Sequence, residues 1–201
     1  VRNSSCWDQD HEIQGYKDPP KRLLGKTSFR EGFAVLNNLG LSFDAWLYHT
    51  QLSELIDLAR AFPNVSIILD HIAGPIGIGR YAGKRDKRFQ VWKSGMTQLA
   101  SCENVVMKVG GFGMPLDGYA WHERDTPASS QEIASTMAPY YDHCIKVFGP
   151  ERCMFESNFP VDKGSTSYTT LWNVFKRVAC GYSASEKASL FRNTARTAYR
   201  I

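Results

Sequence analysis

The hydrophobic positions of this chain follow two alternating spacings. Short apolar runs, rich in β-branched or aromatic residues, predict four strands at 42–48, 65–69, 104–109 and 152–156. Between them, apolar residues recur every three or four positions and predict amphipathic helices at 28–38, 52–62, 85–99, 129–148, 166–180 and 184–199. Residues 1–27 have neither spacing and are predicted to form a loop.

Polar residues with the spacing of a capping box support several of these helix boundaries. In such a box the first side chain accepts a hydrogen bond from the backbone three residues later. The pairs with this spacing are Ser28 with Glu31, Ser129 with Glu132, and Ser183 with Glu186. Gly40, Pro63 and Gly149-Pro150 are expected to end three of the helices.

The order of these elements predicts an α/β protein with a parallel sheet. Strands alternate strictly with helices, and short links favour right-handed crossovers between parallel neighbours. Two architectures fit this order: an open doubly wound sheet, and part of a (β/α)8 barrel. A dinucleotide site is not expected, because Gly77-Ile78-Gly79 lies in a loop and lacks the third glycine of that motif.

Composition adds limits to this fold. The 201 residues suit one domain, 1–201, with 43% hydrophobic and 22% charged residues. The net charge of +4 is scattered, and Asp86 interrupts its only cluster, 84–88, so we expect no nucleic-acid partner. No apolar run is long enough to cross a membrane. Five widely spaced cysteines favour a reducing, cytoplasmic location. Because the chain begins at Val1, we expect a piece of something longer.

Polar residues follow each predicted strand at its carboxyl end. In a parallel sheet these ends share one rim, where α/β enzymes carry their chemistry. The residues are Tyr48-His49, Asp70-His71, Lys108 and Glu156-Ser157-Asn158. Two neutral imidazoles at such positions bind metals or move protons. Lys108 needs an acidic partner or a pocket, because an unpaired buried ammonium is costly. Asp70 is expected to serve packing or a loop turn, and Tyr48 packing rather than catalysis.

Four segments and the closing helix carry a family likeness. "LSFDAWLYHTQL", "IILDHIAGP", "NVVMKVGGFGMP" and "ERCMFESNFPVDK" resemble segments of the amidohydrolase-related family, especially its lactonase-like branch, and "EKASLFRNTARTAYRI" resembles the closing helix of that family. The resemblance implies a partial (β/α)8 TIM barrel, about strands 4/5 to 8, with the N-terminal half missing.

The resemblance also implies roles for individual residues. Val1-Arg2 matches the end of the fourth barrel strand, where the lactonases have a substrate-binding arginine. Tyr48-His49 matches the fifth strand, and His71 matches the sixth, where members have a histidine on metal or substrate. Asn158 stands where most members have the catalytic aspartate on the eighth strand.

Two departures from the family pattern bear on the chemistry. The His-x-His motif of the first barrel strand does not occur in these residues, so they alone cannot complete a metal site. An amide such as that of Asn158 cannot act as a general base and is a poorer ligand for a metal ion. Three alternatives stay open: the base is Glu156 or Asp162, the site works without metal, or it is not catalytic.

Together these observations predict a hydrolase that acts on a lactone, or a related ester or amide, of a small carboxylated molecule. The predicted catalytic residues are His71, Asn158, Glu156 and Asp162; the predicted substrate-binding residues are Arg2, Tyr48 and Lys108; and His49 and His71 are the predicted ligands of a divalent metal, Zn or Mn, with metal-independent action as the alternative. A decarboxylase and a non-catalytic remnant are the competing functions. The expected partners are a small-molecule substrate and a second copy of the chain, with no membrane.

Overall fold

A five-stranded parallel sheet forms the centre of the molecule. The computed structural model describes residues 1–13 and 19–201. The strands lie side by side in chain order: β1 (Arg2–Ser4), β2 (Phe43–Trp46), β3 (Ile67–Leu69), β4 (Val105–Val109) and β5 (Cys153–Phe155). A doubly wound sheet reverses its strand order at a switch point. This sheet has no reversal, so the open doubly wound alternative is wrong.

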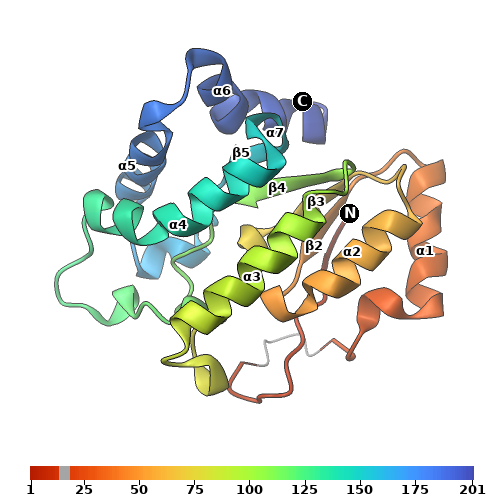
Figure 1. The fold of residues 1–201 in the computed structure, drawn as a ribbon, viewed down its shortest axis with the longest axis horizontal. Helices are drawn as coiled ribbons and strands as arrows, with labels where there is room; N and C mark the ends of the chain where they lie inside the picture. The colour runs from red at the N-terminus through yellow and green to blue at the C-terminus, as the bar shows by residue number, and fades with distance from the viewer. Residues whose placement is uncertain (14–18) are drawn as a thin grey trace.

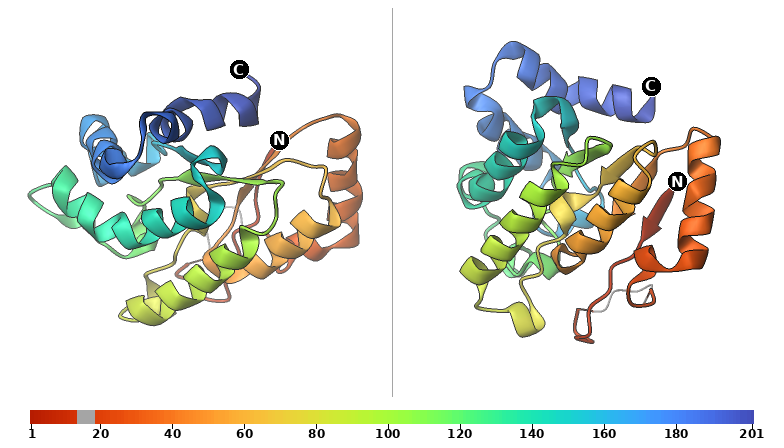
Figure 2. Two further views of the ribbon diagram at one scale, coloured as in Figure 1. Left: turned by 45° about the horizontal axis from the view of Figure 1, so that its top comes forward. Right: turned by 45° about the vertical axis from the view of Figure 1, so that its right-hand side comes forward.

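Most of the helices pack on one side of the sheet, and the last of them reaches the other side, where Tyr199 donates to Asp44. The helices are α1 (Thr27–Asn38), α2 (Leu52–Ala61), α3 (Arg85–Leu99), α4 (Ser130–Phe148), α5 (Tyr168–Val178), α6 (Ala184–Ala188) and α7 (Thr194–Tyr199). In Figure 1, α2, α3 and α4 lie in front of the strands, and Figure 2 shows the same arrangement from two further directions. The predicted helix 184–199 is continuous, because a π-helical turn, Ser189–Asn193, joins α6 to α7.

The two faces of the sheet differ in chemistry. Ala45, Leu69, Met107 and Phe155 point toward the helices and belong to the main hydrophobic core. The alternate positions form the other face, which we call the inner face: Asp44, Trp46, Ile68, Lys108 and Met154. Side chains of a strand alternate between faces, so a charged residue within a strand must lie on the inner face here. The inner face therefore carries the polar groups of the sheet.

The start of the chain corrects the loop predicted over 1–27. Arg2–Ser4 is a strand, β1, paired with β2, and Leu23–Gly25 forms a short 3-10 turn. Arg2 begins this strand, whereas the family resemblance placed it at a strand end. Residues 14–18 of the predicted loop lie outside the described residues. Pairing with Asp44, Ala45 and Trp46 holds β1 in place, and a three-residue strand has no spacing of its own to reveal it.

The capping predictions have different outcomes. Ser129 accepts a hydrogen bond from the Glu132 amide at the start of α4, and Ser183 and Glu186 form a reciprocal capping box at α6. Ser28 does not cap α1, because that helix already begins at Thr27 with Lys26 before it. Within the described part of the chain, no helix has the length and apolar character needed to cross a membrane.

Candidate active site

His71 and Glu156 meet at the carboxyl ends of β3 and β5. The Nδ1 atom of His71 contacts the Glu156 carboxylate, and the His71 backbone N–H donates to the same carboxylate oxygen at 2.9 Å. The side chains are only 5% and 13% exposed. A carboxylate that holds one ring nitrogen of a histidine fixes the orientation of the ring and stabilises its protonated form. A pair of this kind has the arrangement that proton transfer by a histidine requires.

Arg2 shows which nitrogen of His71 carries the proton of the neutral ring. Its Nη2 atom lies 3.2 Å from His71 Nε2, and its Nε atom lies 3.1 Å from Asp70 Oδ2. A guanidinium can only donate hydrogen bonds, so Nε2 is the acceptor and Nδ1 carries the proton that Glu156 accepts. The Arg2 side chain is 55% exposed, so it can move toward a bound molecule. Nε2 thus carries the lone pair of the ring, and here that lone pair accepts from Arg2.

The backbone around His71 is held in an unusual conformation. His71, Ile72, Ala73 and Gly74 all have positive φ angles, of 54°, 47°, 61° and 35°. Only glycine adopts this region without strain, and strained residues cluster at functional sites. Gly111, after β4, leaves the room that the imidazole needs, since a Cβ there would lie 2.6 Å from the Cβ of His71.

Lys108 is engaged in an ion network on the inner face. Its Nζ atom lies 2.8 Å from Asp44 and 2.7 Å from Asp70, and Tyr199 of α7 also donates to Asp44 at 2.8 Å. Burial alone would lower the pKa of Lys108, but the charge of Asp70 and the hydrogen bonds to both acids outweigh it and raise the pKa. Lys108 finds acidic partners, one of the two options that its position in a strand left open.

Asn158 and Asp162 form a separate pair behind the His71–Glu156 contact. Asn158 Nδ2 donates to Asp162 Oδ1 at 2.7 Å, and the Gly113 N–H donates to Oδ2 at 3.1 Å. Burial raises the pKa of Asp162 to about 6, although both hydrogen bonds act in the opposite direction. Asp162 therefore joins the loops that follow β4 and β5, and among the three candidate acidic or amide groups Glu156 contacts His71 directly.

His49 and Tyr48 point elsewhere. The Nδ1 atom of His49 accepts from the Ile76 N–H at 3.3 Å, and its ring packs 5.6 Å from that of Tyr81. Burial lowers the pKa of His49 to about 4, with the charge of Arg88 acting in the same direction. The Tyr48 hydroxyl donates to the Ile13 carbonyl at 3.0 Å within a buried cluster. The structure brings neither side chain into the hydrogen bonds around His71.

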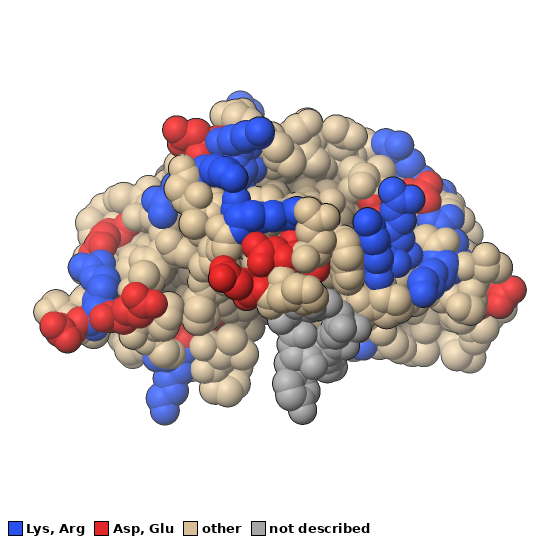
Figure 3. Space-filling model, turned by 90° about the horizontal axis from the view of Figure 1, so that it is seen from below, with Lys and Arg blue, Asp and Glu red and all other residues tan. Residues whose placement is uncertain are grey.

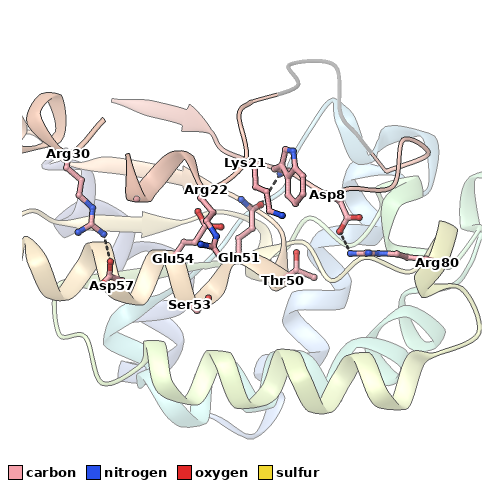
Figure 4. Close-up of a pocket in the computed structure, with 12 residues that line it drawn as sticks. Asp8, Lys21, Arg22, Arg30, Thr50, Gln51, Ser53, Glu54, Asp57 and Arg80 are labelled. Atoms are coloured by element: carbon pink, nitrogen blue, oxygen red, sulfur yellow. Dashed lines mark hydrogen bonds and ion pairs between the residues drawn. The ribbon is translucent and has the colours of Figure 1, made fainter. Parts of the chain in front are cut away.

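A cavity lies beside the loops but does not include His71. The loops that follow β1, β3 and β4 lie at the bottom of Figure 1, and Figure 3 looks onto that end, where charged side chains of both signs gather in the middle. A cavity of about 450 Å³ lies between the N-terminal segment and α2, and Figure 4 shows the residues that line it. It is lined by the ion pairs of Arg30 with Asp57 and Arg80 with Asp8, so its charges are largely matched.

Three residues near His71 were not predicted from the sequence to be site residues. Trp46 packs edge-to-face on His71, with ring centroids 4.6 Å apart, and Asp44 and Asp70 hold Lys108. Asp44 and Trp46 are alternate residues of one strand, and Asp44 is a charged group inside an apolar run. That alternation was the available signal, because it puts both residues on the face opposite to the core.

The fold and the site define a parallel α/β protein with a histidine–carboxylate pair at its strand ends. A family model described as Amidohydrolase matches residues 11–201, and the chain belongs to that family. The predicted family, with its lactonase-like relatives, is confirmed.

Individual relatives agree with this assignment. The chain is 38% identical over 177 residues to the uncharacterized protein y4mH of Sinorhizobium fredii, covering 86% of this chain and 52% of that protein. It is 24% identical over 192 residues to the L-fucono-1,5-lactonase of Burkholderia multivorans, covering 95% and 62%. The chain thus spans about half to three-fifths of the length of these curated relatives.

Solved structures share the fold. A crystal structure of an amidohydrolase from Burkholderia multivorans with bound HEPES has a TM-score of 0.79 at 23% identity, covering 95% of this chain and 63% of that one. A second crystal form of an amidohydrolase from that organism, with bound zinc, has a TM-score of 0.78 at 23% identity, with the same coverage.

The described residues of this chain do not fit a metal ion by themselves. Nowhere in residues 1–13 and 19–201 do three or more His, Cys, Asp or Glu side chains gather so as to hold one. His49, one of the two predicted ligands, uses its Nδ1 lone pair on Ile76 and packs on Tyr81.

Proposed function

We propose that the full-length protein is a hydrolase that opens a lactone, with His71 as the general base. The observation that carries this proposal is the contact of His71 with Glu156 on one side of the ring and with Arg2 on the other. The L-fucono-1,5-lactonase among its relatives supports the substrate class. Lys108, predicted to bind substrate, is bound by two acids instead and has no role in this proposal.

The proposed reaction needs three groups. His71 Nε2 takes a proton from water, and the resulting hydroxide attacks the carbonyl carbon of the lactone. The Glu156 carboxylate stabilises the imidazolium that forms, as a carboxylate does in a catalytic triad. Arg2 stabilises the negative charge on the former carbonyl oxygen. When the ring C–O bond breaks, the imidazolium returns its proton to the alkoxide, and the product is a hydroxy acid.

The sheet is proposed to be the last five strands of a (β/α)8 barrel. Its strands follow one another without reversal, its helices α1 to α5 lie on one side, and its inner face is polar at the strand ends. A barrel of this type carries its chemistry at that end. The expectation that barrel strands precede β1 is tested by the coding sequence upstream of Val1, where an apolar strand with His-x-His is expected.

The test of the function is hydrolysis by the full-length protein across a panel of sugar lactones. The release of acid is measured for the wild type, His71→Ala and His143→Ala. His143 lies on the outer side, between α3 and α4, and serves as the matched histidine control. We expect His71→Ala to lose at least a hundredfold in kcat and His143→Ala to retain wild-type kcat.

The competing functions give different results in the same experiment. A decarboxylase would release carbon dioxide from a carboxylated substrate and leave lactones intact. A non-catalytic remnant, which Asn158 at the usual aspartate position favours, would do neither. Equal hydrolysis by the wild type and His71→Ala would remove His71 from the mechanism.

A further inference from the structure

Trp46 lies next to the reacting histidine and has no role in the proposed chemistry. It ends β2 on the inner face, two residues beyond Asp44, and is partly exposed. Its ring centroid lies 4.6 Å from that of His71, with the planes at 75°. The indole therefore packs directly against the proposed general base.

Contacts with Gly74 and Tyr48 hold the indole of Trp46 in place. A Cβ at Gly74 would lie 2.6 Å from Trp46 Cη2 and 3.0 Å from Cζ3, so the absence of a side chain there leaves room for the six-membered ring. Tyr48 packs against it with ring centroids 6.0 Å apart. Gly74 belongs to the same positive-φ segment as His71. The backbone that orients the histidine therefore also orients the tryptophan.

Charge near His71 limits which molecules can bind there. Two cations, Arg2 and Lys108, face three carboxylates, those of Asp44, Asp70 and Glu156. Each of the two cations already has an acidic partner. A substrate with two carboxylates would meet net negative charge at this place, whereas an uncharged ring would not.

We propose that Trp46 is the platform on which the substrate ring stacks, and that it selects an uncharged, hydroxylated sugar lactone over open-chain esters and planar dicarboxylates. The face of an indole carries a negative electrostatic potential and attracts the weakly positive C–H groups of a saturated sugar ring, while the hydroxyls point to the polar rim. This inference rests on the proposed function, since it concerns the substrate of the same site.

Binding of a matched pair of ligands to the full-length protein tests the platform. An aldonolactam is a ring that resists hydrolysis, and the open-chain aldonamide of the same sugar acid lacks the ring. By calorimetry, the wild type should bind the lactam at least tenfold more tightly than the aldonamide. Trp46→Leu should weaken lactam binding about tenfold and change aldonamide binding less than twofold, with Trp46→Phe in between. Trp172→Phe, in α5, is the control and should behave as wild type.

Circular dichroism and thermal melting show whether each variant is folded, and Trp46→Phe keeps an aromatic face if Trp46→Leu fails to fold. Equal lactam affinity in the wild type and Trp46→Leu overturns the platform, as does a wild type that binds no lactam or that prefers a planar pyrone dicarboxylate. His71→Ala separates the two proposals. Loss of hydrolysis in His71→Ala with unchanged lactam affinity in Trp46→Leu rejects only the platform. Lactam binding that depends on Trp46, without any lactone hydrolysis, rejects only the proposed function.

Discussion

At the scale of single residues, the charge of Glu156 sets what His71 can do. Glu156→Gln keeps an oxygen for the Nδ1–H and backbone N–H of His71 but removes the charge that stabilises the imidazolium. We expect kcat for lactone hydrolysis to fall by about a hundredfold or more, with little change in KM. Glu123→Gln, an exposed glutamate in the loop after β4, is the control. A kcat within threefold of wild type in Glu156→Gln would assign Glu156 a purely structural role.

Lys108 has a role in stability that can be measured apart from activity. Lys108→Met leaves the carboxylates of Asp44 and Asp70 in a largely buried place without their shared cation. Removing one partner of a buried ion network costs about 3–5 kcal/mol, and we expect that loss in the free energy of unfolding by urea. Lys87→Met, on the exposed side of α3, should change it by less than about 0.5 kcal/mol. Adding Asp44→Asn to Lys108→Met should restore part of the loss; no restoration would contradict the network.

Asp162 predicts a pH dependence of stability. Its pKa is about 6 in the folded protein against an ordinary 3.8, chiefly because it is buried. Between these values the folded state binds more protons than the unfolded state, so the stability from this group is full below about pH 4 and is lost as pH rises through about 6. The difference between the folded and unfolded pKa values corresponds to about 3 kcal/mol in the free energy of unfolding.

Asp162→Asn cannot titrate and isolates this contribution. The amide also disturbs the hydrogen bonds from Asn158 and Gly113, which costs stability at every pH. The informative quantity is therefore the wild-type stability minus the variant stability, which should decrease between about pH 4 and pH 6. A difference that stays constant over this range would mean that Asp162 keeps an ordinary pKa.

At the scale of elements, the turn after β4 makes room for the histidine after β3. Gly111→Ala would put a Cβ 2.6 Å from that of His71, at a φ of +73°. We expect a loss of about 1–3 kcal/mol in stability and at least tenfold in kcat, because the imidazole must shift. Gly32→Ala, in α1, meets no atom within 4 Å and should be neutral or stabilising. If both variants kept wild-type kcat, the turn would not position His71.

The elements that could be predicted from sequence are those with a spacing of their own. Apolar spacing predicts the buried run Ile67–Leu69 and the amphipathic helices α2 to α5. β1 could not be predicted from spacing, since three residues form a strand only through their partners on β2. The Ser28–Glu31 spacing predicted a cap wrongly, because α1 begins one residue before Ser28, at Thr27.

The candidate site was predictable as far as strand direction determines it. His71 and Glu156 follow neighbouring parts of one sheet, so the rule that strand ends share a rim brings them together. His49 follows a strand equally closely, yet it opens a 3-10 turn that directs its ring toward Ile76 and Tyr81. The sequence carries no signal for that rotation. The alternation along β2 does put Trp46 on the same face as Asp44, but an aromatic residue in a strand is usually core.

At the scale of the whole molecule, the sheet has two open edges. Among the described residues β1 pairs only with β2, and β5 pairs only with β4. Val1 and Leu41 add exposed apolar surface where β1 begins. Unpaired strand edges are templates for pairing with another chain. The 201 residues on their own are therefore expected to self-associate.

Light scattering after gel filtration measures this association, and the expected mass of the isolated 22.7 kDa chain is that of a dimer or larger. The Val1 carbonyl and the Ser5 N–H bond to β2, so in a parallel pair the N–H of Ser4 faces the open edge. Ser4→Pro removes that donor without breaking the ladder to β2 and should lower the associated fraction, whereas Asn3→Pro removes a donor to β2 and should destabilise β1. A stable monomer that unfolds cooperatively, with no effect of Ser4→Pro, would show that the isolated chain needs no partner for its edges.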